Sequence, residues 1–187
     1  MDIAVYGGSF NPLHIGHLAI LRHLAERFDK VLLVVSPKNP LKDIESDGTE
    51  RLDAAVAAVG RHPELEGKVE VCDIEYHLPL PSYTYRTLDA LNAGNYWKEE
   101  PDSFTLVMGG DQIADIRRWR EYQHILKDYG VAVFPREGFD LEAIKADLLE
   151  EDPDYSIELM DAPLVTVSST EIREGVASGK DISGLLM

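Results

Sequence analysis

Cysteine and long apolar runs are scarce in this chain of 187 residues, and each scarcity excludes a class of protein. Cys72 is the single cysteine, so no disulfide can form within the chain, and its alternating strand-like surroundings predict a buried, unreactive thiol. No apolar run approaches the roughly 18 residues that a membrane helix needs, and the first residues enter a strand without a basic leader. These features predict a cytoplasmic protein with no membrane partner.

Cationic residues are also few, because 18 Lys and Arg face 34 Asp and Glu, which gives a formal net charge of −16. Surfaces that bind nucleic acid need clustered Lys and Arg to replace the counterions around phosphates, so we expect no nucleic-acid partner. The same charge would repel a small anionic substrate. A phosphate pocket in this chain must therefore be locally positive, and we expect it to use a divalent cation.

Apolar residues make up 44% of the chain, and they alternate between the strand period and the helix period. Short strands are predicted at Ile3 to Tyr6, Val31 to Ser36, Val69 to Ile74, Phe104 to Met108, Val131 to Phe134 and Ile157 to Leu159. Helical faces are predicted at Leu18 to Phe28, Leu52 to Val59, Leu88 to Leu91 and Leu141 to Leu148. This alternation is typical of an α/β fold, and we expect a Rossmann-like, doubly wound parallel sheet with helices on both faces, as a single domain over residues 1–187.

The most informative segment runs from Gly7 to His17, where a glycine turn follows the first strand and leads into two histidines three residues apart. A helix that begins here presents unpaired N–H groups and the positive end of its dipole to an anion. His14 and His17 would share one face of its first turn, so both imidazoles can reach one phosphate. Each histidine also has a plainer interpretation, as a helix cap or a surface side chain. A metal pair is disfavoured, because no cysteine or carboxylate lies within the segment.

A second informative segment runs from Ser168 to Arg173. Ser168 and Glu171 have the spacing of a capping box, which predicts that a helix begins here. Arg173 lies one turn into that helix, where it can meet a phosphate bound by the hydroxyls and free N–H groups of the helix start. A helix cap with no ligand would explain the same spacing.

Together the two segments resemble the signatures of the nucleotidyltransferase superfamily. Residues 7–17 are similar to Gly-x-Phe-Asp/Asn-Pro-x-His-x-Gly-His, and residues 168–173 resemble the second signature, which binds the triphosphate. Three further segments resemble the nicotinate-nucleotide adenylyltransferase family: Ser36 to Lys42, Ser82 to Leu88, and Met108 to Asp111 followed by Trp119. Two departures stand out: Arg86 occupies a position where the family usually has Asp, and this sequence ends at Leu185-Leu186-Met187, before the position of the family's usual further C-terminal helix.

The resemblance implies transfer of AMP from ATP to the phosphate of nicotinate mononucleotide, with Mg²⁺ as the cofactor. It implies catalytic roles for His14, His17, Lys42 and Arg173, the imidazoles as donors to phosphate oxygens and the two cations as holders of the triphosphate. It places the pyridine nucleotide on Tyr83, Thr84 and Trp119. It places ATP on Gly7, Gly8, Ser9, Phe10, Gly16, Gly109, Asp111, Ser168, Ser169 and Thr170.

Three alternatives stay open at this point. The acceptor could be nicotinamide mononucleotide or phosphopantetheine, or the chain could be a nucleotide sensor without turnover. Individual residues have plainer interpretations too: Lys42 as a solvated loop lysine, Asp111 as a helix N-cap and Trp119 as a core residue. The sequence leaves the oligomeric state open, a homo-oligomer included.

Overall fold

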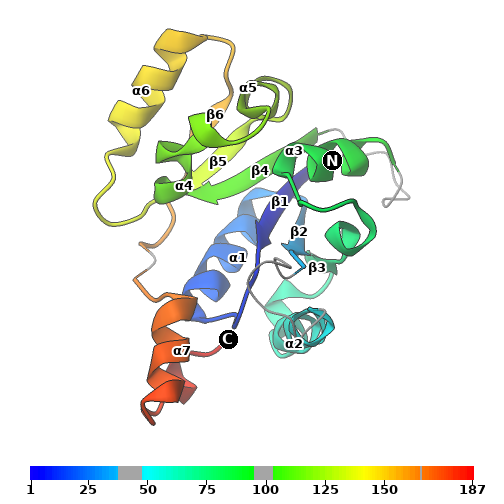
Figure 1. Cartoon of the computed structure of the whole chain (residues 1–187), viewed down its shortest axis with the longest axis vertical. Helices are drawn as coiled ribbons and strands as arrows, with labels where there is room; N and C mark the ends of the chain where they lie inside the picture. Colours follow the sequence, from blue (N-terminus) through cyan, green and yellow to red (C-terminus); the bar gives the residue numbers. More distant parts are fainter. Residues whose placement is uncertain (38–47, 95–102, 165) are drawn as a thin grey trace.

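Six parallel strands form one sheet in the order β3-β2-β1-β4-β5-β6 (Figure 1). The computed structural model describes residues 1–37, 48–94, 103–164 and 166–187. The strand order runs outward in both directions from the β1–β4 pair, which confirms the predicted doubly wound parallel sheet. The strands are β1 (Asp2–Gly8), β2 (Lys30–Val35), β3 (Val69–Cys72), β4 (Ser103–Gly109), β5 (Val131–Phe134) and β6 (Ile157–Leu159).

Helices connect the strands and cover both faces of the sheet, as predicted. Short 3₁₀ or π turns lie at Pro63–Leu65, Ile74–His77, Ile116–Arg118, Ile125–Tyr129 and Ser183–Leu185. The helices are α1 (Ile15–Arg27), α2 (Thr49–Gly60), α3 (Thr84–Asn92), α4 (Gly110–Ala114), α5 (Tyr122–His124), α6 (Leu141–Glu151) and α7 (Ser169–Ala177). None of the helices in the described residues is long and apolar enough to span a membrane.

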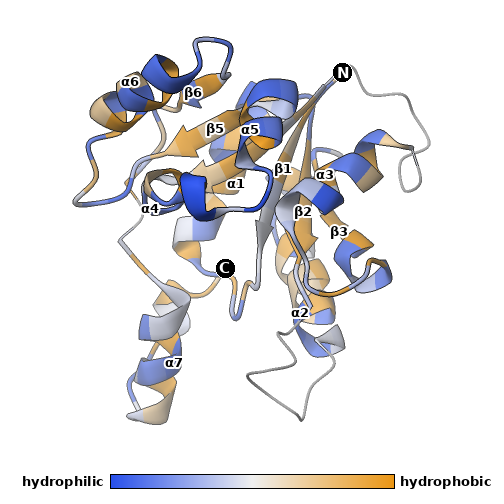
Figure 2. Ribbon diagram, turned by 45° about the horizontal axis from the view of Figure 1, so that its top comes forward, coloured by the Kyte–Doolittle hydropathy of each residue, from blue (hydrophilic) through white to orange (hydrophobic). Residues whose placement is uncertain are grey.

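Alternate residues of each strand enter two separate apolar layers. On β1, Ala4 and Tyr6 pack with α1 and α2, while Ile3 and Val5 pack with α3 and α6 on the other face. Figure 2 shows the hydrophobic colour along β2 and β5, while the helices around them carry both colours. Burial of both faces explains why the strands read as short continuous apolar runs. Cys72 is buried, as predicted.

The predicted apolar face of α2 is wrong at Val56, which is 56% exposed. The buried positions of this helix are Arg51, Ala55 and Ala58. Alanine side chains are short, so they let the helix lie close to the sheet. Arg51 is buried because its Nη1 donates to the carbonyls of Ser9 and Ser36, both at 2.8 Å. The helix therefore ties the loop after β1 to the loop after β2.

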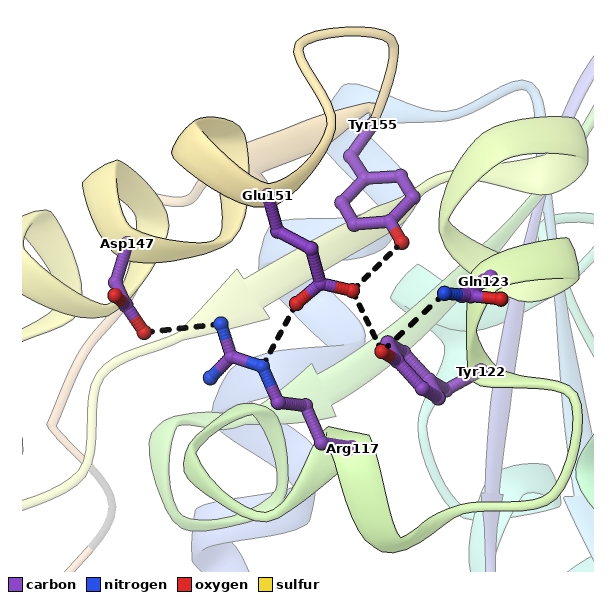
Figure 3. Close-up of polar contacts among 6 residues, drawn as sticks. All are labelled: Arg117, Tyr122, Gln123, Asp147, Glu151 and Tyr155. Carbon is purple, nitrogen blue, oxygen red and sulfur yellow. Dashed lines mark hydrogen bonds and ion pairs between the residues drawn. The ribbon is translucent and has the colours of Figure 1, made fainter.

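A polar network fixes the short helical turns after β4 against α6 (Figure 3). Arg117 donates to Glu151 at 2.8 Å and forms an ion pair with Asp147 at 3.0 Å. The other Glu151 oxygen accepts from Tyr122 at 2.6 Å and from Tyr155 at 3.1 Å. Arg117 and Tyr122 thereby attach both ends of the segment that contains Trp119 to Glu151 of α6.

Candidate nucleotide site at the switch point of the sheet

A cavity of about 240 Å³ opens at the carboxyl edge of the sheet, where β1 and β4 lie side by side. Open α/β sheets bind their ligands at this position, because the connections diverge there and leave a crevice. β1 contributes Gly7 and Gly8, which are its last two residues and not the turn that the sequence predicted. β4 is followed by the start of α4, and β5 is followed by Arg136. The lining residues are Tyr6, Gly7, Gly8, Ser9, Phe10, His14, His17, Asp111, Gln112, Phe134, Arg136, Val167, Ser168 and Ser169.

His14 and His17 form a reciprocal cap at the start of α1. The Nδ1 atom of His14 accepts from the backbone N–H groups of Gly16 at 3.1 Å and His17 at 3.3 Å. The Nδ1 atom of His17 accepts in turn from the backbone N–H of His14 at 3.1 Å. An Nδ1 that accepts a hydrogen bond carries no proton, so the proton of each neutral ring is on Nε2. Both rings therefore offer an Nε2–H donor.

Their surroundings keep both imidazoles neutral. The rings stack on each other with centroids 3.6 Å apart, and the His17 ring meets the edge of Phe10 at 5.1 Å. Burial lowers the pKa of His14 to about 4, and the charge of Arg136 adds to the shift. Burial and the adjacent His14 lower the pKa of His17 to about 3. At neutral pH the pair can donate hydrogen bonds to phosphate oxygens without a proton-transfer role.

The structure brings the two signature segments to the same cavity. Ser168 caps α7 by accepting from the N–H of Glu171, which confirms the predicted capping box. Ser169 Oγ donates to the carbonyl of Pro12 at 2.9 Å, and Arg173 Nη1 donates to the carbonyl of Asn11 at 2.5 Å. Figure 1 shows the start of α7 beside the loop that follows β1. These bonds join the C-terminal element to the loop that carries the histidines.

A second cavity, of about 250 Å³, adjoins the first. The two share Gly7, Gly8 and Gln112 in their walls. Trp119 and Thr84 line the second cavity, so Trp119 is not solely a core residue. Its other lining residues are Val5, Val34, Ser36, Glu75, Ser82, Thr87, Leu88, Leu106 and Val107. The glycine end of β1 thus separates a histidine-lined chamber from a tryptophan-lined chamber.

Several predicted site residues lie beside the cavities without lining them. Gly16 contributes its N–H to the His14 cap, and Thr170 accepts from Arg173 at 3.1 Å. The ring of Tyr83 stacks near Tyr85 with centroids 6.1 Å apart. Lys42 lies outside the described residues.

Gly109 is the N-cap of α4, so the interpretation of Asp111 as that cap is wrong. A Cβ on Gly109 would lie 2.7 Å from Asp111 Oδ1 and 3.0 Å from the Phe134 ring, so any side chain there would displace one of them. The Asp111 carboxylate is instead left at the cavity, half exposed, with its Oδ1 3.7 Å from Arg136 Nε.

Two cationic residues of the site were missed by the sequence interpretation. Arg136 lines the first cavity, two residues beyond the end of β5. A basic residue directly after a predicted strand is the signal that could have found it. Arg51 is the second, because its guanidinium donates to the carbonyl of Ser9 and so holds the loop after β1 in place.

The described residues contain no group of three His, Cys, Asp or Glu side chains that could hold a metal ion. Mg²⁺ is commonly held by substrate phosphates and one or two carboxylates, and Asp111 is a single carboxylate at the cavity. This donor set fits a magnesium ion that enters on a nucleotide.

A doubly wound sheet, a helix start and two neutral imidazoles at its switch point define an α/β nucleotide-binding protein. A family model described as cytidylyltransferase-like matches residues 5–175. The chain belongs to this family.

Curated relatives match over nearly the whole chain. A probable nicotinate-nucleotide adenylyltransferase of Flavobacterium johnsoniae is 38% identical over 190 residues, covering 100% of this chain and 92% of the relative. One of Bacteroides fragilis is 38% identical over 184 residues, covering 95% and 83%.

Solved structures share the fold. The nicotinic acid mononucleotide adenylyltransferase of Plasmodium falciparum in complex with NaAD has a TM-score of 0.76 at 22% identity, covering 97% of this chain and 86% of that one. The complex of the Plasmodium falciparum enzyme with APC has a TM-score of 0.72 at 20% identity, covering 99% and 90%.

Proposed function

We propose that this chain transfers AMP from ATP to nicotinate mononucleotide, giving nicotinate adenine dinucleotide and pyrophosphate. The observation that carries the proposal is the pair of adjoining cavities on either side of Gly7 and Gly8. A reaction that joins two nucleotides needs two ligand chambers that meet at the reacting phosphates. The relatives named as nicotinate-nucleotide adenylyltransferases support the same reaction.

The chemistry suits the groups at the shared wall. A phosphate oxygen of the mononucleotide attacks the α-phosphorus of ATP, and the bond from that phosphorus to the α–β bridging oxygen breaks. The attacking phosphate is already an anion at neutral pH, so no general base is required. Negative charge shifts to the departing pyrophosphate, where the Nε2–H groups of His14 and His17 can donate to its oxygens. Neutral donors suffice, because their role is to stabilise charge rather than to move a proton.

The other predicted residues take supporting roles in this proposal. Ser168, Ser169, Thr170 and Arg173 would hold the triphosphate with Lys42, and Arg136 adds a cation to the same cavity. Asp111 would accept from ribose hydroxyls. Trp119 would stack on the pyridine ring, while backbone N–H groups at Tyr83 and Thr84 would receive the nicotinate carboxylate. Ser9, Phe10, Gly16 and Gly109 would shape the ATP side of the site.

Mg²⁺ is proposed to bind through the oxygens of ATP, where it would neutralise the leaving group. Residues 1–187 are proposed to act as a single domain, since both cavities are built on one sheet. The cytoplasmic location, the absence of a nucleic-acid partner and the oligomeric state stay predictions.

One assay tests the proposal. Pyrophosphate release is measured from ATP and Mg²⁺ with nicotinate mononucleotide, nicotinamide mononucleotide or phosphopantetheine offered in turn. We expect the highest kcat/KM with nicotinate mononucleotide. Preference for phosphopantetheine would contradict the acceptor, and nucleotide binding without release would identify a sensor.

A further inference from the structure

Two arginines contact the ring of Tyr83, which lies between two residues that line the second cavity. The Cζ atom of Arg120 lies 4.6 Å from the Tyr83 ring centroid, and that of Arg86 lies 5.0 Å from it. Arg86 also donates from Nε to the hydroxyl of Tyr85 at 3.2 Å. Stacking on aromatic rings fixes the guanidinium planes and leaves their N–H groups directed sideways, where they can meet an anion.

These two cations have no acidic partner among the described residues, although both contact one tyrosine ring. Acidic residues outnumber basic ones almost twofold in the chain, and Arg22, Arg27 and Arg117 each form ion pairs. Among the described residues, no carboxylate lies within ion-pair distance of Arg86 or Arg120. In a strongly acidic protein, an uncompensated pair of guanidiniums is a local positive site.

The pair belongs to the two chain segments that line one side of the second cavity. Trp119 lines this cavity, and Arg120 directly follows it in the chain. Ser82 and Thr84 also line the cavity, and Tyr83 lies between them in the chain. The contact of Arg120 with Tyr83 joins the two chain segments that form this wall. The hydrogen bonds of Arg117 and Tyr122 with Glu151 fix the chain on both sides of Trp119 (Figure 3). They therefore also restrict the position of the Arg120 backbone.

We propose that Arg86 and Arg120 select the acceptor by the charge on its pyridine ring, favouring the nicotinate carboxylate over the neutral carboxamide. The inference rests on the proposed function and adds its specificity residues. The acceptor phosphate is a poorer match for these cations, because the phosphate must lie at the shared wall near His14 and His17 in order to react. A positive charge at position 86 is compatible with this acceptor, because it would attract the negative nicotinate carboxylate.

The test measures kcat/KM for nicotinate and nicotinamide mononucleotide with wild type, Arg120→Gln, Arg86→Gln and the double variant. We expect the preference for nicotinate mononucleotide to fall roughly tenfold in each single variant and further in the double variant, as for loss of a charge-assisted hydrogen bond. The activity with nicotinamide mononucleotide should change little. The wild-type preference should also shrink as salt is raised, because exposed charges are screened.

Arg118→Gln is the matched control, because it removes the same charge beside Trp119 from an exposed side chain that does not touch Tyr83. It should leave the preference unchanged. Arg120→Lys keeps the charge but loses the planar stack, and it should retain most of the preference at low salt. Thermal unfolding of each variant checks that it is folded.

An equal loss for both acceptors would overturn the inference, since it would indicate a phosphate contact or a structural role. A control variant that lowers the preference as much as Arg120→Gln would overturn it too. If wild type releases no pyrophosphate, the proposed function fails separately. Calorimetric binding of the two mononucleotides to the same variants then still decides whether the arginines distinguish them.

Discussion

Replacing His17 by alanine removes two separate contributions of one side chain. The imidazole caps α1 by accepting from the backbone N–H of His14, and its Nε2–H faces the first cavity. Loss of the cap costs about 0.5–2 kcal/mol. Loss of the edge contact with Phe10 costs about 0.5–1.5 kcal/mol more. For a domain of this size, each kcal/mol lowers the melting temperature by roughly 2–4 °C.

The effect on turnover should be much larger than the effect on stability. Removal of one donor to the transition state lowers kcat by roughly 10²–10³-fold. ATP affinity should fall only modestly, because the donor matters most once charge has moved to the leaving group. The assay is pyrophosphate release at saturating ATP, with ATP binding measured separately by calorimetry.

His17→Gln is the matched variant that separates the two contributions. A glutamine at this third helical position can accept from the cap residue's N–H, as in a capping box, so the melting temperature should recover. Its kcat should stay close to that of His17→Ala, because the amide used as a cap does not place a donor at the phosphate. If both the melting temperature and kcat recover in His17→Gln, the imidazole has no catalytic role and acts only as part of the helix cap.

Three further predictions concern stability. The pKa values of His14, about 4, and His17, about 3, lie below the ordinary 6.5, so the neutral pair contributes stability that is fully present above pH 6.5 and lost as pH falls toward 4. Wild type and His17→Gln should therefore be similar in urea unfolding at neutral pH and diverge over that range, with wild type losing more; equal losses would contradict this. Arg51→Met should lower the free energy of unfolding by about 2–4 kcal/mol, because two loop carbonyls lose their donor, and equal urea midpoints would contradict this. Hydrogen bonds from Tyr122 and then Arg117 lower the pKa of Glu151 to about 2 from 4.5, so Glu151→Gln should be less stable than wild type at pH 7 and equal to it near pH 2 by thermal unfolding.

The parts of the fold that were predicted correctly depend on local pattern. The strand that begins the chain and the cap at Ser168 each follow from a few adjacent residues whose backbone preferences agree. The predicted strand end was wrong by two residues, because Gly7 and Gly8 still pair with β2 and belong to β1. Continuous apolar strands predicted the parallel sheet, because only strands buried on both faces have that composition. The doubly wound arrangement was predicted from these patterns together with the family resemblance, whereas the order of the six strands comes from the structure.

The features that the sequence did not predict correctly depend on contacts between distant segments of the chain. Val56 has the right spacing for a buried face, yet α2 turns its alanines to the sheet because Arg51 reaches the loops after β1 and β2. Arg136 enters the site only because β5 lies beside β4 in the sheet. The stacking of Arg120 on Tyr83 joins segments far apart in sequence, and no local pattern predicts it.

The account depends most on a single polyphosphate lying between the imidazoles and the start of α7. A crystal structure of the chain with Mg²⁺ and a non-hydrolysable ATP analogue would test this directly. We predict phosphate oxygens within hydrogen-bond distance of Nε2 of His14 or His17 and, in the same molecule, of Ser168 or Ser169. Phosphates bound elsewhere, such as in the groove between α2 and β3, would contradict the account.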